Sequence, residues 1–196
     1  MIQQFQNCIK FFSDLILAEL PAVCWIAGGA LRDYFTIGRC SSDIDIFFPS
    51  EKEFKKAIKF FKIQNILPTF SNERVTNYIW KKNKIQLVSA HYFSSPEETI
   101  EKFDFTVVCC AVDKENVSHH ETFFMDLAKR RLVINSLPYP LSTLQRLQKY
   151  IKKGYTICNG GLLEIAKAIQ KVNLENSTEN PIEFYLDGSV RFIRID

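Results

Sequence analysis

The order of apolar and polar positions predicts a chain in which helices and strands alternate. Apolar side chains recur at helical spacing in some segments and at every second residue in others, which is typical of strands. Helices are predicted at residues 3–19, 30–35, 50–62, 142–154 and 162–169, with a further one beginning at residue 96. Strands are predicted at residues 22–27, 42–48, 75–80, 85–92, 105–112 and 122–125, followed by a polar loop at 173–181 and a hairpin that joins 184–185 to 190–195 around Asp187 and Gly188.

Serines mark the first turn of two of these helices. Ser50 is followed three residues later by Glu53, and Ser95 by Glu98. This spacing lets each serine oxygen accept a hydrogen bond from the backbone amide three residues on. Pro96 adds a residue that is favoured at the first helical position. Both helices are therefore predicted from their N-terminal signals as well as from their periodicity.

The intermixing of strands and helices predicts an α/β (α+β) fold with a mixed, mainly antiparallel sheet flanked by helices. A hairpin is expected around Lys82 and Asn83, and the continuous apolar run at 105–112 suits a central strand. We expect residues 1–140 to form the main domain, and residues 141–196 to form a short helical and hairpin extension packed on it.

The composition indicates a chain that folds around a buried core. Of its 196 residues, 46% are hydrophobic and 24% are charged, which excludes wholesale disorder. The 17 phenylalanines are expected to fill the core. Lys10 and Asp14 interrupt the first apolar run before it reaches the length of a membrane span, so no membrane partner is expected. The net charge of +3 is too small to indicate a nucleic-acid partner by itself.

The cysteines and histidines indicate no metal centre. The 6 cysteines form no C-x-x-C pair, so we expect free thiols in a reducing cytoplasm. Cys109 and Cys110 are adjacent, and on a strand they would point to opposite faces. His119 and His120 lie in a polar segment and are expected at the surface.

Two aspartates stand two residues apart on the strand predicted at 42–48. Because side chains alternate between faces along a strand, Asp43 and Asp45 would share one face, while Ile44 and Ile46 point into the core. Two convergent carboxylates suit Mg²⁺, with Mn²⁺ as an alternative, held jointly with triphosphate oxygens. An Asp-x-Asp pair is also common on a merely solvated strand face, so its neighbours decide its meaning.

Those neighbours are typical of a phosphate site. Gly28 and Gly29 separate a predicted strand from a predicted helix, and residues without a Cβ atom let a phosphate approach the backbone amides of a helix N-terminus. Arg32 would contact a phosphate or form a structural pair with Asp33. A Gly-Gly turn alone is usually only a turn, but its order with the Asp-x-Asp strand is more specific.

That order of motifs resembles the signature of the polymerase-beta-type nucleotidyltransferases. It is most similar to the head domain of bacterial-type tRNA CCA-adding enzymes and poly(A) polymerases, which carry a Gly-Gly-x-Val-Arg-Asp turn, a Gly-Arg and an Asp-x-Asp strand. Leu31 replaces the valine here, and Gly38-Arg39 supplies the second motif. The resemblance implies a nucleotidyltransferase sheet, an NTP substrate, and metal ions held by Asp43 and Asp45.

Two later segments continue the resemblance. Residues 103–106 are similar to the family's Arg-Arg-Asp-Phe-Thr segment, which implies that Asp104 faces the nucleotide sugar. Arg146 and Lys149 match the family's Arg-x-x-Arg-Phe helix, which implies that they balance phosphate charge.

Four features depart from the family. Lys102 and Phe103 replace an arginine pair, so one positive charge is missing. Gln86 lies on the strand that often carries a further acidic residue, and a neutral amide cannot balance a second metal ion. The family's Glu-Asp-x-x-Arg segment, which chooses C and A, has no counterpart, and the helical neck, body and tail that hold the tRNA acceptor arm would follow this chain's last residues. CCA addition by this chain alone is therefore not expected.

A basic segment precedes and includes the helix predicted from Ser142. Residues 127–163 contain no acidic side chain but include Lys129, Arg130, Arg131, Arg146, Lys149, Lys152 and Lys153. On the helix, Leu144, Leu147 and Ile151 are expected to share the buried face, and Arg146, Lys149, Tyr150 and Lys153 the opposite face. That opposite face would suit a triphosphate or an RNA backbone, or it would simply be solvated.

Two classes of function follow from these residues. The first is a nucleotidyltransferase that moves a nucleoside monophosphate from an NTP to a hydroxyl. An RNA (tRNA-like) 3′ end is the favoured acceptor, and toxin-type modification of tRNA or of a partner protein is the alternative. Another protein would supply the missing surface that holds the acceptor. The second class is a nucleotide- or RNA-binding module without turnover, which the neutral Gln86 favours; a structural role within a larger complex is a third interpretation.

Overall fold

The computed structural model describes residues 2–172, which divide into two compact units, one ending at Ser136 and one beginning at Leu137. Each unit is described by itself, and the predicted division at residue 140 stays a prediction. In the first unit the strands are β1 (Trp25–Ala27), β2 (Ile44–Phe47), β3 (Phe70–Ser71), β4 (Val75–Trp80), β5 (Asn83–Val88), β6 (Cys110–Val112), β7 (Val117–His119) and β8 (Arg131–Leu132). Its helices are α1 (Ile2–Phe12), the π-helical turn η1 (Ser13–Leu17), α2 (Gly29–Ile37), α3 (Glu51–Ile63), α4 (Pro96–Glu101), the 3₁₀ turn η2 (Thr106–Val108) and α5 (Phe123–Lys129). The second unit holds α6 (Pro140–Lys152), β9 (Thr156–Ile157) and α7 (Asn159–Gln170).

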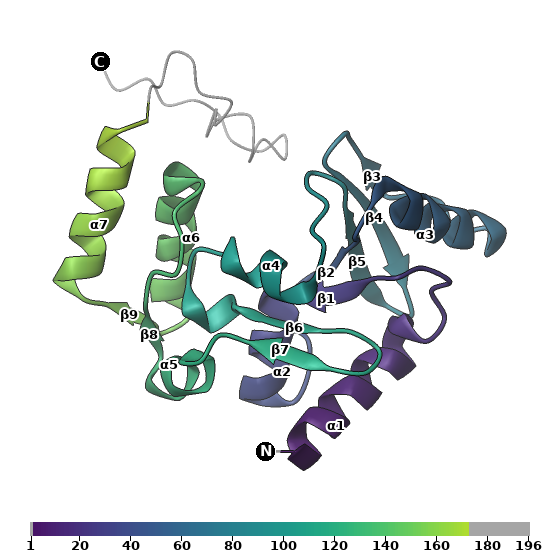
Figure 1. Ribbon diagram of the computed structural model, residues 1–196, viewed down its shortest axis with the longest axis horizontal. Helices are drawn as coiled ribbons and strands as arrows, with labels where there is room; N and C mark the ends of the chain where they lie inside the picture. Colours follow the sequence, from purple (N-terminus) through teal and green to yellow (C-terminus); the bar gives the residue numbers. More distant parts are fainter. Residues whose placement is uncertain (1, 173–196) are drawn as a thin grey trace. The chain divides into compact units, whose positions relative to one another are not determined.

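A seven-stranded sheet, in the order β3-β4-β5-β2-β1-β6-β7, is the centre of the first unit (Figure 1). The parallel pair is β2 with β5, and the other neighbouring strands pair antiparallel. The predicted fold class, a mixed and mainly antiparallel sheet with helices, is confirmed.

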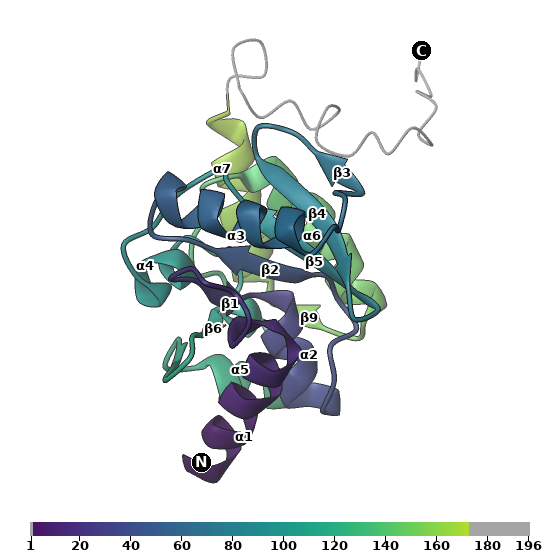
Figure 2. The same cartoon turned by 90° about the vertical axis from the view of Figure 1, so that its right-hand side faces the viewer.

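Helices cover both faces of this sheet. Helix α3 lies across β2, β4 and β5 (Figure 2), where the Phe61 ring stacks on Tyr78 with centroids 4.0 Å apart. Helix α4 covers the other face, where the Trp25 indole N–H donates to the Thr99 hydroxyl at 2.9 Å. Helix α1 packs on α2, with the Phe12 and Tyr34 rings 5.6 Å apart. Phe12, Phe48, Phe61, Phe105 and Phe123 are among the largest fully buried side chains of the described residues, whereas Phe70 is exposed, so some of the phenylalanines fill the core.

The predicted serine caps are present. The Ser50 side chain accepts from the Glu53 amide at the start of α3, and the Ser95 side chain accepts from the Glu98 amide at the start of α4. The Glu53 carboxylate accepts a hydrogen bond from the Val23 backbone amide at 2.8 Å. This bond connects α3 to the segment before β1.

Two predicted strands are wrong. Residues 105–112 are not one central strand, because the chain turns through η2 before β6 begins. Residues 122–125 lie at the start of helix α5. A continuous apolar run carries no period of its own, so it does not distinguish a strand from a buried helix. The decisive contact is tertiary: the Thr106 and Thr122 hydroxyls both donate to the Asp126 carboxylate, at 2.7 and 2.6 Å.

Several predicted boundaries also shift. The first two strands begin late, at Trp25 and Ile44, so Asp43 directly precedes β2. The hairpin turn is at Lys81 and Lys82, whose φ angles of 47° and 68° suit the tight turn between antiparallel strands. Strands β3, β7, β8 and β9 were not predicted. The polar loop at 173–181 and the hairpin around Asp187 and Gly188 lie outside the described residues.

The buried face of α6 also differs from the prediction. Thr143, Leu147 and Tyr150 are buried, whereas Leu144 and Ile151 are 41% and 53% exposed. The buried residues are spaced four and three apart and so form one helical stripe. Tyr150 belongs to that stripe because its ring packs edge-on against the Tyr155 ring, with centroids 5.6 Å apart.

The cysteines are free thiols, as predicted, and all of them lie within residues 2–172. Burial raises the pKa of Cys8 and Cys24 to about 12, which makes both poor nucleophiles at neutral pH. Within the described part of the chain, no helix is long and apolar enough to cross a membrane.

Candidate functional site

The two candidate metal-binding aspartates lie at the start of β2. Asp45 is in the strand and Asp43 directly precedes it, and both are half-buried. Ile44 and Ile46 are 1% and 0% exposed. This alternation agrees with the expected arrangement, in which the carboxylates share one face and the isoleucines face the core.

Gln86 stands directly beside Asp45. Strand β5 pairs in parallel with β2, so that Asp45 is opposite Gln86, and β4 places Asn77 opposite Gln86 in turn. The Gln86 side-chain amide donates to the Asn77 side-chain oxygen at 3.0 Å. The strand that carries Gln86 therefore neighbours the Asp-x-Asp strand, and the neutral side-chain amides of Gln86 and Asn77 lie next to Asp45 in the sheet.

A lysine that the sequence pattern did not reveal contacts the other aspartate. The Lys84 ammonium donates to Asp43 Oδ2 at 2.6 Å, and the two side chains are 46% and 44% exposed. An ion pair this accessible contributes roughly 0–1 kcal/mol to stability. Strand alternation could have placed Lys84 on the same face as Gln86, but its partner depends on the register between β2 and β5.

The Gly-Gly turn abuts the segment that leads to Asp43. Gly28 has a φ of 90°, which a residue with a side chain rarely adopts, and a Cβ there would lie 3.5 Å from the Phe103 ring. A Cβ on Gly29 would lie 3.4 Å from the Cβ and Oγ atoms of Ser42. Since α2 begins at Gly29, its N-terminal amides lie close to the residues that precede the candidate carboxylates.

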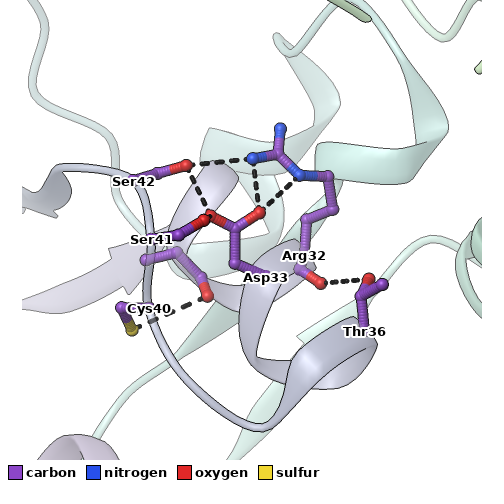
Figure 3. A network of polar contacts seen from close by, with 7 residues as sticks. Arg32, Asp33, Thr36, Cys40, Ser41 and Ser42 are labelled. Atoms are coloured by element: carbon purple, nitrogen blue, oxygen red, sulfur yellow. Dashed lines mark hydrogen bonds and ion pairs between the residues drawn. The ribbon is translucent and has the colours of Figure 1, made fainter. Parts of the chain in front are cut away.

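A buried polar network fixes this neighbourhood (Figure 3). Arg32 and Asp33 on α2 are 5% and 6% exposed. The Arg32 guanidinium donates to Asp33 Oδ1 through Nε at 2.8 Å and through a terminal nitrogen at 2.5 Å. Asp33 Oδ2 accepts from the Ser41 and Ser42 hydroxyls, each at 2.6 Å, and Ser42 also accepts from Arg32 at 2.9 Å. The network joins α2 to the two residues before Asp43.

The electrostatics of Asp33 follow from these contacts. Burial alone would raise the pKa of Asp33. The hydrogen bonds from Ser41 and Ser42, together with the charge of Arg32, outweigh burial and hold the pKa below its ordinary value. Arg32 therefore makes the structural pair that was one of its two expected roles, and its contact with a phosphate stays a prediction.

The segment around Asp104 is also fixed from within the first unit. Asp104 is 4% exposed, and its Oδ1 accepts from the Phe105 amide at 3.0 Å. The Asn135 side chain donates to the Phe103 carbonyl at 2.9 Å, and its backbone amide donates to the Asp104 carbonyl at 2.8 Å. Phe103, in the place of an arginine, packs against the apolar cluster that contains Trp25. Contact of Asp104 with a sugar stays a prediction.

The remaining predicted residues lie in the second unit. On α6, Arg146 is half-buried and Lys149 is exposed. Their contacts with a nucleotide stay predictions.

The donor set fits a magnesium ion that shares its coordination with a substrate. No group of three or more His, Cys, Asp or Glu side chains within residues 2–172 could hold a metal by itself. Mg²⁺, however, commonly binds one or two carboxylates together with phosphate oxygens and water. Asp43 and Asp45 supply that number of carboxylates.

Comparisons with known families and curated proteins give a match over most of the first unit. A model described as "Gabija anti-defense 2 family protein" matches residues 3–130. The protein named Gabija anti-defense 2 from Bacillus phage SPbetaL7 is 31% identical over 157 residues, which cover 79% of this chain and 39% of that protein. The chain thus spans about two fifths of the length of this curated relative.

Solved structures share the fold at low sequence identity. A structure titled tRNA-processing enzyme (apo form I) matches with a TM-score of 0.60 and 14% identity, over 84% of this chain and 46% of that one. The Thermotoga maritima CCA-adding enzyme, complexed with tRNA, matches with a TM-score of 0.59 and 16% identity, over 88% and 43%. The Bacillus stearothermophilus CCA-adding enzyme, in complex with CTP, matches with a TM-score of 0.56 and 16% identity, over 88% and 46%. The fold implied by the sequence motifs is confirmed.

Proposed function

This chain belongs to the Gabija anti-defense 2 family, and on that premise we propose that it is a metal-dependent nucleotidyltransferase that acts against the Gabija defence. It takes an NTP with Mg²⁺ or Mn²⁺ and moves the nucleoside monophosphate onto a hydroxyl group. The relative's name supports the biological role but names no reaction. Support for the reaction comes from the fold and from the residues of the site.

One observation carries most weight: two half-buried carboxylates follow a loop that is hydrogen-bonded to the first turns of a Gly-Gly helix. Asp43 and Asp45 share a strand face, and Gly29 lies against Ser42, directly before Asp43. A phosphate at the helix N-terminus would therefore be near a place where the aspartates hold a cation. Such an arrangement suits the positioning and charge neutralisation on which phosphoryl transfer depends.

In the reaction, each side chain has a distinct task. Asp43 and Asp45 hold the cation, and the Gly29 amide at the helix N-terminus binds a phosphate oxygen. The Gly28 amide donates to the Cys110 carbonyl at 3.0 Å, so Gly28 contributes to the phosphate cradle through its missing Cβ atom. Arg32 keeps the Gly-Gly helix and the loop before Asp43 together. Further charge balance comes from Arg146 and Lys149, and Asp104 contacts the sugar; these residues are assigned to the nucleotide site because of their matches to family motifs.

The chemical step exchanges one phosphorus–oxygen bond for another. The acceptor oxygen bonds to the α-phosphorus. The bond between the α-phosphorus and the oxygen that bridges the α- and β-phosphates breaks, and pyrophosphate leaves. The hydroxyl proton passes to an aspartate carboxylate or to water. When bound, Mg²⁺ neutralises the charge that develops on the phosphates.

The acceptor that we favour is the 3′ end of a tRNA-like RNA. Two of the matched structures are complexes, one with tRNA and one with CTP, which supports RNA and NTP as partners of this fold. A protein partner supplies the surface that holds the acceptor, and the reaction takes place in the cytoplasm, where NTPs, RNA and free thiols coexist.

A second candidate function is nucleotide or RNA binding without turnover. Two contacts favour it: the neutral Gln86 is opposite Asp45, and Lys84 is bound to Asp43. Both reduce the negative charge available to cations. In this case the protein would act against the defence by holding a nucleotide or an RNA.

Label transfer distinguishes the two functions. The protein is incubated with each NTP labelled at the α-phosphate, with Mg²⁺ or Mn²⁺, in the presence of total RNA or protein. Asp43→Asn and Asp45→Asn should each lower transfer on the order of 10²-fold or more, as removal of one preorganised electrostatic group does. Asp14→Asn, the same substitution at an exposed position of η1, should leave transfer unchanged. Nucleotide binding without any transfer would favour the second function.

The biological role is tested in the same variants. Phage infection of a strain protected by the Gabija defence should be restored by the wild-type chain and by Asp14→Asn. If Asp43→Asn restores infection equally well, transfer is not the means by which the protein acts. If the wild-type chain restores nothing, the assigned role is wrong.

A further inference from the structure

The Lys84–Asp43 ion pair lies where a two-metal site would need negative charge. We propose that the Lys84 ammonium takes the place of one of two metal ions, so that the nucleotide site holds a single divalent cation. This inference rests on the proposed function, because it concerns how the same site binds an NTP. Lys84 thereby determines how many divalent cations the nucleotide site binds.

The geometry places Lys84 on the candidate site itself. Ile44 is opposite Ile85 in the parallel pairing of β2 with β5, which puts the preceding residues, Asp43 and Lys84, beside each other. Their charged groups are 2.6 Å apart. A cation that binds the same Asp43 oxygen must therefore displace Lys84 or lie next to its ammonium.

The charges on this face favour one divalent cation over two. Before a triphosphate binds, the Asp43, Asp45 and Lys84 side chains together carry one net negative charge, and Gln86 adds a dipole in place of a carboxylate. Two divalent cations would repel each other and the ammonium, and interactions between charges a few ångströms apart are strong even near a protein surface. One divalent cation with one ammonium lowers that repulsion.

The ammonium can also perform part of a metal ion's task. It carries three N–H donors, and Asp43 accepts from one of them. At 46% exposure, Lys84 is accessible to a bound triphosphate. A lysine contacts phosphate oxygens as a point charge, and it needs neither a fixed coordination geometry nor the loss of bound water.

An ordinary surface ion pair is the simpler interpretation, and the chain offers a matched control. Lys55 pairs with Glu51 at 2.8 Å on α3, and both side chains are exposed. That helix covers the face of the sheet opposite the candidate site. Lys55→Met thus removes the same charge from a similar pair without touching the site.

The test counts Mn²⁺ ions bound per chain by electron paramagnetic resonance, with a non-hydrolysable triphosphate at saturation. The wild-type chain should bind one Mn²⁺. Lys84→Met should bind a second Mn²⁺, because one unit of positive charge is removed from beside the site. Its affinity for this second ion should be about ten-fold higher than any weak binding of a second ion by the wild-type chain. Lys84→Arg, which keeps the charge, and Lys55→Met should each bind one. Circular dichroism and thermal unfolding establish that each variant is folded, and Lys84→Gln serves if Lys84→Met is not.

The outcomes separate this inference from the proposed function. Two Mn²⁺ ions on the wild-type chain, or one on both Lys84→Met and Lys84→Gln, would overturn the role of Lys84, and label transfer would still support the transferase. If the wild-type chain shows no triphosphate-dependent Mn²⁺ binding and no label transfer, both proposals are wrong.

Discussion

Asp33 is expected to control the site although it is not expected to touch the nucleotide. Its carboxylate accepts hydrogen bonds from Arg32, Ser41 and Ser42, and the two serines lead directly into Asp43. Replacing Asp33 with alanine removes the acceptor at the centre of this network. We expect a less stable protein in which the candidate metal ligand Asp43 is less firmly positioned.

The size of the effect follows from burial. Asp33 and Arg32 are both almost fully buried, and removing one partner of a buried ion pair typically costs about 3–5 kcal/mol. Ser42 still accepts from Arg32 in the variant, so we place Asp33→Ala near the lower end, at about 3 kcal/mol. Asp33→Asn keeps one oxygen for Arg32 and should lower the free energy of unfolding by about 1–2 kcal/mol.

The pH dependence of unfolding gives an independent signature. Because the folded-state pKa of Asp33 is lowered, its stabilising contribution is complete above the unfolded pKa of about 3.9 and is lost as the pH falls through the folded pKa. The difference in free energy of unfolding between wild type and Asp33→Asn should therefore be constant near neutral pH. It should shrink below about pH 4.

Urea unfolding and nucleotide-dependent Mn²⁺ binding are the two measurements. Glu53→Ala is the control for stability alone, because Glu53 is buried and accepts from the Val23 amide and Lys56, but lies on α3, on the opposite face of the sheet. Asp33→Ala should weaken Mn²⁺ binding more than Glu53→Ala does. Equal binding in the two variants, or a free energy of unfolding for Asp33→Ala within about 0.5 kcal/mol of wild type, would refute the reasoning.

Three further outcomes are expected. Arg146→Ala combined with Lys149→Ala should weaken NTP or RNA binding. The slope of log affinity against log salt concentration should fall by about one unit for each phosphate interaction that the substitutions remove. If affinities measured at two salt concentrations match those of wild type, this face of α6 is merely solvated. Gln86→Glu should tighten Mg²⁺ binding in a titration, because it adds a carboxylate beside the Asp-x-Asp pair, and an unchanged midpoint would mean that the side chain does not face the metal. Ser50→Ala and Ser95→Ala should each lower the free energy of unfolding by about 1 kcal/mol in urea, since each serine caps a helix; no change would mean that water replaces the cap.

Local chemistry made part of this structure predictable. Ser50 and Ser95 cap their helices because the serine hydroxyl and the backbone amide three residues later are close in sequence, so their hydrogen bond does not depend on tertiary contacts. Strand alternation is equally local, and it separated the Asp43 and Asp45 side chains from the buried Ile44. The order of the Gly-Gly and Asp-x-Asp motifs indicated the fold, which the matched structures confirm.

Long-range contacts decided the elements that were predicted wrongly. Residues 105–112 are apolar throughout, and no period within them distinguishes a strand from a turn of helix. The buried Asp126 carboxylate, which accepts from Thr106 and Thr122, joins two segments whose pairing no local pattern specifies. On α6, helical spacing placed Tyr150 on the face of Arg146 and Lys149, yet its ring is buried.

The same distinction applies to the candidate site. The sequence by itself determined that Asp43 and Asp45 face one way and that a glycine turn precedes them, because both depend on neighbouring residues. Only the tertiary structure decided that Gln86 stands opposite Asp45 and that Lys84 binds Asp43 across 41 residues of chain. The physical reason is register: a shift of one residue between parallel strands would reverse which side chains meet, and that register is set by the packing of the whole sheet.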